Sequence, residues 1–113
     1  MLFRSQSCSG CASGYDVGYI GNGGTLTFNN VSAPTTGAQN LTISYEDGDA
    51  GRSATLTVNG TQTTVSFTGL DNNNWVTPQT KTVSVNLNAG SSNTIVFSNA
   101  SGWAPNVDEI IVY

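Results

Sequence analysis

The sequence predicts an all-β domain built as a two-sheet antiparallel β-sandwich. Apolar and polar residues alternate with a period of two along much of the chain, as they do in strands with one buried and one exposed face. Thr, Val, Ile and aromatic residues favour strands, whereas the Gly and Asn residues between the alternating segments favour tight turns. No segment has convincing helical periodicity. Because strands with a single apolar face need a second sheet to cover it, two layers are expected.

About eight short strands are expected, each with one apolar face. In chain order, the apolar positions are Tyr15, Val17 and Tyr19; Leu26 and Phe28; Leu41, Ile43 and Tyr45; Ala54, Leu56 and Val58; Val65 and Phe67; Val83, Val85 and Leu87; Ile95 and Phe97; and Ile110 and Val112. The clearest connection is the hairpin at Asn59-Gly60, because both residues tolerate the positive φ of a type I′ turn.

A chain of 113 residues is expected to form one domain, 1–113, with a core large enough to be stable without metals or disulfides. Residues 1–14 are expected to form an irregular N-terminal segment. Further irregular stretches are expected at 47–52, 69–79 and 99–106. Since loops on a rigid scaffold often carry function, candidate functional residues are sought in these stretches.

The charge of the chain excludes several classes of partner. Only 9% of residues are charged, the net charge is −4, and the basic residues are Arg4, Arg52 and Lys81. Three cations cannot form the basic stripe that nucleic acids or anionic membrane surfaces require. No apolar run approaches the ~20 residues of a membrane helix. No signal peptide is recognisable after Met1, so a secretion signal is expected to lie outside this sequence if the protein is secreted.

Cys8 and Cys11 form a C-x-x-C pair with three interpretations. A redox pair needs a βαβ context, which is absent here. A zinc site needs two further Cys or His ligands, and the chain has neither. A disulfide is therefore the preferred prediction, and it implies an oxidising, extracellular compartment. Candidate N-glycosylation sequons occur at Asn30, Asn40, Asn59 and Asn99. They are weak evidence for secretion, because a chain so rich in Ser, Thr and Asn contains such matches by chance.

Catalysis is not expected from this composition. The absence of histidine excludes Ser-His and Cys-His nucleophile pairs. Carboxylates could form a glycosidase acid/base pair. However, Glu46, Asp47 and Asp49 fall in one short turn, which is typical of a solvated loop or a cation site. The domain is predicted not to be an enzyme.

Carbohydrate binding fits the loop residues better. Sugars have apolar C–H faces and hydroxyl edges, so their sites need an aromatic platform and a few fixed polar groups. Trp103 with Asn106, and Arg52 after an acidic loop, meet this need. From residue type alone, Trp103 could equally cap the core. Arg52 could simply pair with Asp47 or Asp49, and Trp75 is expected to pack in the core or at its rim.

An ordered series of segments resembles carbohydrate-binding module family 35 and its relative family 6, which have a galactose-binding-like jelly-roll sandwich. The segments are "VGYIGNGGTLTFNNV", "LTISYEDGDAGRSATLTVNG", "VSFTG" and "GWAPNVDEIIVY". The resemblance implies that Trp103 stacks on a sugar, Asn106 and Arg52 bind hydroxyls or a uronate carboxylate, and Tyr19 walls the pocket. It implies non-catalytic binding of galactose- or uronic-acid-containing polysaccharide, as a targeting module of an extracellular glycoside hydrolase.

The start of the chain departs from this family pattern. The family opens with a Glu-Ala-Glu strand that helps to bind a structural calcium, whereas here only Asp108 matches a calcium ligand. The first strand is therefore expected to be truncated, or replaced by residues 2–7. A missing strand would leave an unpaired edge, and such edges recruit other chains. The alternative function is accordingly a self-assembling extracellular glycoprotein domain that forms homo-oligomers by edge-strand pairing.

Overall fold

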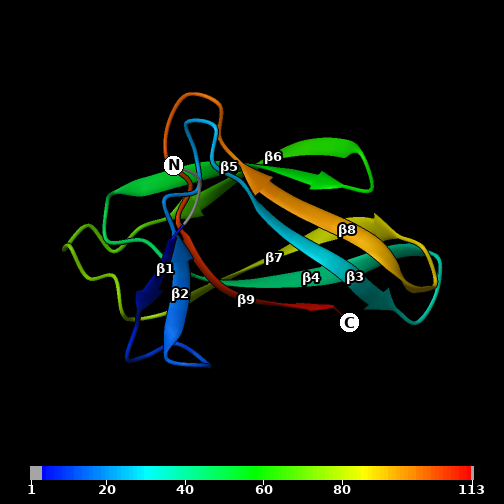
Figure 1. Ribbon diagram of the computed structural model, residues 1–113, viewed down its shortest axis with the longest axis horizontal. Helices are drawn as coiled ribbons and strands as arrows, with labels where there is room; N and C mark the ends of the chain where they lie inside the picture. Colours follow the sequence, from blue (N-terminus) through cyan, green and yellow to red (C-terminus); the bar gives the residue numbers. More distant parts are fainter. Residues whose placement is uncertain (1–3, 113) are drawn as a thin grey trace.

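Nine strands make up the fold in the computed structural model, which describes residues 4–112 (Figure 1). The strands are β1 (Arg4–Ser7), β2 (Tyr15–Gly18), β3 (Leu26–Ala33), β4 (Gly37–Glu46), β5 (Gly51–Val58), β6 (Thr61–Thr68), β7 (Gln79–Leu87), β8 (Gly90–Ser98) and β9 (Asn106–Val112). No helix occurs in this range, and so none of the described segments is a helix that could cross a membrane.

The strands form two antiparallel sheets, as the sequence predicts. One sheet has the order β1-β2-β9-β4-β7 and the other β3-β8-β5-β6, which is consistent with a jelly roll. The β5–β6 hairpin turns through Asn59 and Gly60 with φ of 49° and 88°, which confirms the predicted type of turn. The two sheets face each other across the core in Figure 1.

The N-terminal segment is more regular than the sequence predicts. Its residues Arg4–Ser7 form β1, which pairs with β2 at the edge of the five-stranded sheet. The sequence "RSQS" has no apolar alternation, so this strand escapes detection from periodicity. The prediction that residues 2–7 replace the first strand falls partly outside the described residues.

The predicted apolar faces form the core. Leu41, Ile43 and Tyr45 alternate along β4 and are at most 1% exposed. The Tyr45 ring meets the Phe67 ring at 4.8 Å, and its hydroxyl donates to the Thr68 carbonyl at 2.9 Å, which satisfies the one polar atom of the side chain. The prediction that the strand beginning at Tyr15 extends to Tyr19 is wrong, because β2 ends at Gly18 and Tyr19 lies outside it with a φ of 58°.

The predicted disulfide between Cys8 and Cys11 is present, and it lies in a loop held against the five-stranded sheet. The Cys8 amide donates to the Gly14 carbonyl at 2.9 Å, which closes the loop. The Ala12 amide donates to both carboxylate oxygens of Asp108, at 3.1 and 3.3 Å, which fastens the loop to β9.

The four sequons differ in what their side chains already do. Asn59 donates to Asn93 Oδ1, and Asn99 donates to the carbonyl of Ser53, both at 2.8 Å. A glycan on either amide would replace these bonds. Asn30 and Asn40 are exposed, and they remain the better candidates for attachment.

Candidate functional site

Two loops distant in sequence lie side by side at one end of the sandwich (Figure 1). Gly21, which follows β2, forms a bridge with Trp103, which precedes β9. The Ala104 amide donates to the Ile20 carbonyl at 2.8 Å. Gly21 has a φ of 142°, and a Cβ there would collide with the Gly102 carbonyl oxygen, so the close approach requires glycine. These contacts fix the position of Trp103.

A hollow of about 400 Å³ opens beside these loops. It is lined by Gln6, Tyr19, Arg52, Trp75, Trp103 and Asn106. The structure therefore brings together all four residues predicted to bind the ligand: Tyr19, Arg52, Trp103 and Asn106. Sequence reasoning did not assign Gln6 or Trp75 to this site.

Trp103 and Tyr19 form an aromatic corner at the hollow. The two side chains are 42% and 43% exposed, and their rings meet at 5.8 Å with an interplanar angle of 88°. A positive φ at a bulky residue such as Tyr19 is rare and recurs at functional sites. Of the two interpretations of Trp103, the structure shows the indole displayed at the surface and not capping the core.

Arg52 both forms a local ion pair and lines the hollow. Its Nη2 lies 2.6 Å from Asp49 Oδ2, its Nε donates to the same oxygen, and its Nη1 donates to the Ala104 carbonyl at 3.1 Å. The guanidinium carbon lies 4.6 Å from the centre of the Trp75 ring, within the range of a cation–π contact. The ion pair is exposed and stabilises little, but with the carbonyl bond it orients the guanidinium.

Trp75 is a half-buried wall of the hollow, and its loop folds over Gly48. Its Nε1 donates to Asn73 Oδ1 at 3.1 Å, and the Asn73 amide donates to the Gly48 carbonyl at 2.9 Å. The expectation that Trp75 packs in the core or at its rim is therefore incomplete, because this residue also lines the hollow. No sequence signal shows where the indole lies, because its position depends on how two loops pack together.

Gly48→Ala is expected to weaken ligand binding several-fold by displacing Trp75. An added Cβ would lie 2.6 Å from Trp75 Nε1 and 2.9 Å from the Asn73 carbonyl carbon, closer than real contacts. Overpacking of this kind also costs about 1–3 kcal/mol of folding stability. Titration calorimetry and thermal unfolding measure the two effects. Gly102→Ala is the control, because its Cβ would meet nothing closer than 3.8 Å; equal affinities for the two variants would contradict the role of Trp75.

The acidic turn is not the solvated loop that the sequence suggests. Glu46 and Asp47 are fully buried, and only Asp49 is exposed. Glu46 is the last residue of β4 and lies in register with Asn106 of β9. Asp47 Oδ1 accepts the Asp49 amide at 3.0 Å, and burial raises the pKa of Asp47. The sequence shows the charge of these residues but not that neighbouring segments cover them.

Asn106 lines the hollow and lies in register with the buried Glu46. It is 6% exposed, and its Nδ2 donates to Gln6 Oε1 at 3.2 Å at the base of the hollow. Nearby, Asp16 and Glu46 face each other at 3% and 0% exposure. Burial, followed by the proximity of Asp16, raises the pKa of Glu46 to about 9. Burial raises the pKa of Asp16 as well, so a protonated Glu46 can donate to the Asp16 carboxylate.

Asp108, the one residue that matches a calcium ligand of the family, does not by itself form the structural calcium site that the resemblance suggests. Calcium takes six to eight oxygen ligands. Here an N–H donor, the Ala12 amide, points at both oxygens of Asp108. Asp108 therefore holds the disulfide loop against β9 in this structure.

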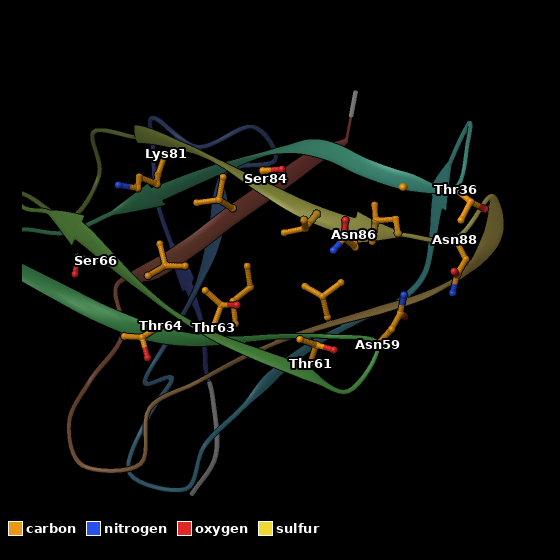
Figure 2. Close-up of a pocket in the computed structure, with 17 residues that line it drawn as sticks. Thr36, Asn59, Thr61, Thr63, Thr64, Ser66, Lys81, Ser84, Asn86 and Asn88 are labelled. Atoms are coloured by element: carbon orange, nitrogen blue, oxygen red, sulfur yellow. The ribbon is translucent and has the colours of Figure 1, made fainter.

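A second hollow, of about 540 Å³, lies between the edge strands β6 and β7 (Figure 2). Leu56, Val65 and Val85 are among its apolar lining residues, and Thr, Ser and Asn side chains surround them. None of the described residues that line it is aromatic. Although it is larger, this groove lacks the platform that a sugar site requires, so the smaller hollow is the better candidate.

Comparison with known proteins agrees with the geometry. The family model called CBM13-like, which is described as the CBM13 domain of alpha-galactosidase, matches residues 25–112. A family 35 carbohydrate-binding module from Clostridium thermocellum is 30% identical, with a TM-score of 0.91, over 99% of this chain and 87% of that one. A CBM35 from Paenibacillus barcinonensis is 25% identical, with a TM-score of 0.85, over 100% and 89%.

An enzyme also contains a similar domain. The exo-beta-1,3-galactanase from Phanerochaete chrysosporium, crystallised with galactose, is 33% identical with a TM-score of 0.89. The match covers 98% of this chain and 26% of that one, so the chain spans about a quarter of the enzyme. No curated protein sequence matches the chain.

Proposed function

Because this chain belongs to the family 35 carbohydrate-binding modules, a non-catalytic class of domain, we propose that its aromatic hollow binds a galactose-containing polysaccharide. The observation that carries the proposal is the meeting of Trp103, Tyr19, Trp75 and Arg52 around one hollow. Aromatic rings with a few fixed polar groups are what a sugar requires, with its apolar face and hydroxyl edge.

Each lining group has a part in the proposed binding. The exposed indole of Trp103 receives the apolar face of the sugar, and Tyr19 bounds it at a right angle. Arg52 uses three of its five N–H donors on Asp49 and Ala104, and those that remain serve hydroxyl groups. The amides of Gln6 and Asn106, which also line the hollow, supply further polar groups.

The charges around the hollow favour a neutral galactoside over a uronate. Asp49 already pairs with Arg52, the one cation among the lining residues. An incoming carboxylate would therefore meet a guanidinium that Asp49 already neutralises, and it would lose its hydration without gaining a new ion pair, whereas neutral hydroxyls avoid this cost.

The proposed biological role is to target a glycoside hydrolase to its polysaccharide outside the cell. It is supported by the galactanase, in which a similar domain occupies part of a longer chain. It is also supported by the disulfide, because disulfides persist in oxidising compartments. Tethering a module of modest affinity to an enzyme raises the effective concentration of the enzyme at the polymer.

The experiment is titration of the domain with β-1,3-galactan oligosaccharides and, separately, with oligogalacturonate. We expect the galactan to bind more tightly, and Arg52→Met to weaken that binding about 10-fold, the loss of a hydrogen bond to a charged group. Lys81→Met is the control, because Lys81 is an exposed cation that lines the other groove. A preference for the uronate would refute the charge argument, and an unchanged affinity of Arg52→Met would exclude Arg52 from the site.

Edge-strand assembly remains a prediction for a different experiment. β1 occupies the edge position beside β2, the kind of position at which another chain can add a strand. Light scattering of the same sample measures the oligomeric state. A multimer that binds neither carbohydrate would favour assembly over the proposed function.

A further inference from the structure

Four buried side chains that could bind a metal converge beneath the disulfide loop. Cys8, Cys11, Asp16 and Glu46 each place a sulfur or a carboxylate oxygen within 4.8 Å of the others. The four residues are between 0% and 8% exposed. They come from the loop after β1, from β2 and from the end of β4, so only the folded chain brings them together.

The carboxylates of this cluster have no described partner that balances them. All four oxygens of Asp16 and Glu46 are buried without a hydrogen bond when both groups are ionised. The three cations of the chain are Arg4, Arg52 and Lys81; Arg52 pairs with Asp49, and Lys81 is exposed on β7. Buried carboxylates usually pair with a cation or bind a metal. No described contact gives Asp16 or Glu46 a cation, so the pair is a candidate for metal binding.

We propose that reduction of the Cys8–Cys11 disulfide converts this cluster into a four-coordinate site for a zinc ion, with two sulfur and two carboxylate ligands. Zinc accepts Asp and Glu ligands as well as Cys, and tetrahedral bonds of ~2.0–2.3 Å place ligand atoms roughly 3.3–3.8 Å apart. In the oxidised chain the four ligand atoms lie within 4.8 Å of one another, and breaking the S–S bond lets the two sulfurs move apart toward this spacing. The sequence argument rejected zinc for want of two Cys or His ligands, whereas the fold supplies two carboxylates.

The chemical step balances with an ordinary reductant. Two thiols, or one phosphine and one water molecule, give two electrons to the S–S bond; the thiols become a disulfide, and the phosphine takes the oxygen of the water and becomes a phosphine oxide. The two sulfurs each take a proton, from the reductant thiols or from that water, and become thiols. Zinc then replaces at least these two protons, because the thiolate is the ligand. The disulfide and the metal use the same sulfurs, so the two states exclude each other.

The loop has contacts that hold the sulfurs in place when the S–S bond is absent. The Cys11 amide donates to the Cys8 carbonyl at 3.2 Å, and the Gly14 amide donates to the Cys11 carbonyl at 3.1 Å. The bonds from Ala12 to Asp108 fasten the same loop to β9. C-x-x-C is also a common spacing for zinc ligands.

The choice of zinc over calcium follows from the donor set. Sulfur ligands select zinc and similar metals, whereas calcium takes six to eight oxygens. Asp16 and Glu46 offer four oxygens between them. None of the four cluster residues lines the hollow, and this inference does not depend on the proposed sugar ligand.

The test is metal titration of the full chain, reduced with a phosphine under exclusion of oxygen, against the oxidised chain. Cobalt(II) is the first probe, because thiolate coordination gives a near-ultraviolet charge-transfer band and tetrahedral cobalt absorbs visible light; zinc then displaces it. We expect one ion per reduced chain, at least 100-fold weaker binding by the oxidised chain, and the release of at least two protons.

Variants decide which side chains are ligands. Glu46→Gln and Asp16→Asn should each weaken zinc binding to the reduced chain at least 10-fold, whereas Glu109→Gln, an exposed carboxylate on β9, should leave it unchanged. If reduction unfolds the chain, recovery of its circular dichroism on addition of zinc supports the site.

Four results would overturn the proposal. They are equal affinity in the oxidised and reduced chains, unchanged affinity in both carboxylate variants, displacement of cobalt by equimolar calcium, and an unfolded reduced chain that zinc does not restore. Because the readouts are metal binding and folding, failure here leaves the carbohydrate experiment unaffected.

Discussion

Trp103→Ala is expected to reduce galactan binding by at least ~30-fold while leaving the sandwich folded. The indole is 42% exposed at the hollow, so its removal opens no cavity in the core. Aromatic residues at the centre of a site commonly contribute 2 kcal/mol or more to binding, and every 1.4 kcal/mol is tenfold in affinity. The loop keeps its backbone bonds to the segment after β2, because these involve main-chain atoms.

The measurement is titration calorimetry with galactan oligosaccharides, accompanied by thermal unfolding. Tyr15→Ala is the matched control, since Tyr15 is 58% exposed on β2 and does not line the hollow. Trp103→Phe should retain part of the affinity, because a smaller ring still offers an apolar face. Wild-type affinity in Trp103→Ala with a normal unfolding temperature would place the ligand elsewhere, and the groove of Figure 2 would be examined next.

The sequence predicts the core of this fold well because burial and periodicity have the same cause. Leu41, Ile43 and Tyr45 alternate because one face of β4 packs on the opposite sheet, and they are buried as expected. Asn59-Gly60 predicts its hairpin because few residues accept two successive positive φ angles. Strand β1 has neither signal, since backbone pairing with β2 defines it.

The hollow was predictable where a loop residue has an unusual type, and not where position depends on packing. Trp103 and Arg52 stand out among turn residues, and the family resemblance assigned them a role. Trp75 and Gln6 enter the same hollow because one loop packs over Gly48 and because β1 pairs with β2. No local pattern encodes such contacts between segments.

The buried acids show the same limit more sharply. A run such as "YEDGD" looks like a solvated turn, because the sequence reports charge and not burial. The structure places the disulfide loop, fastened by Asp108, close to Glu46. Covering a carboxylate in this way stabilises its protonated form, so the stability of the fold is expected to fall as the pH rises.

Glu46→Gln is expected to stabilise the oxidised protein at alkaline pH by about 1–3 kcal/mol, the usual cost of a buried group that lacks a partner. Burial, then Asp16, raises the pKa of Glu46 to about 9 in the folded state, against 4.5 as its ordinary value. The folded state therefore binds a proton that the unfolded state releases. The stability from Glu46 is complete below pH 4.5 and is lost progressively as the pH rises to about 9.

Thermal unfolding at pH 5, 7 and 9, with a chelator present to remove metal ions, measures this dependence. The wild-type midpoint should fall as the pH rises, whereas that of Glu46→Gln should fall less, because a neutral amide can donate to the Asp16 carboxylate at every pH. The charged groups acting on Glu46 are Asp16 on β2 and Asp108 on β9, and both raise its pKa. Glu109→Gln, on the exposed side of β9, should follow the wild type. Parallel curves for wild type and Glu46→Gln would mean that Glu46 does not retain its proton in the folded state, and the electrostatic account of the cluster would have to be abandoned.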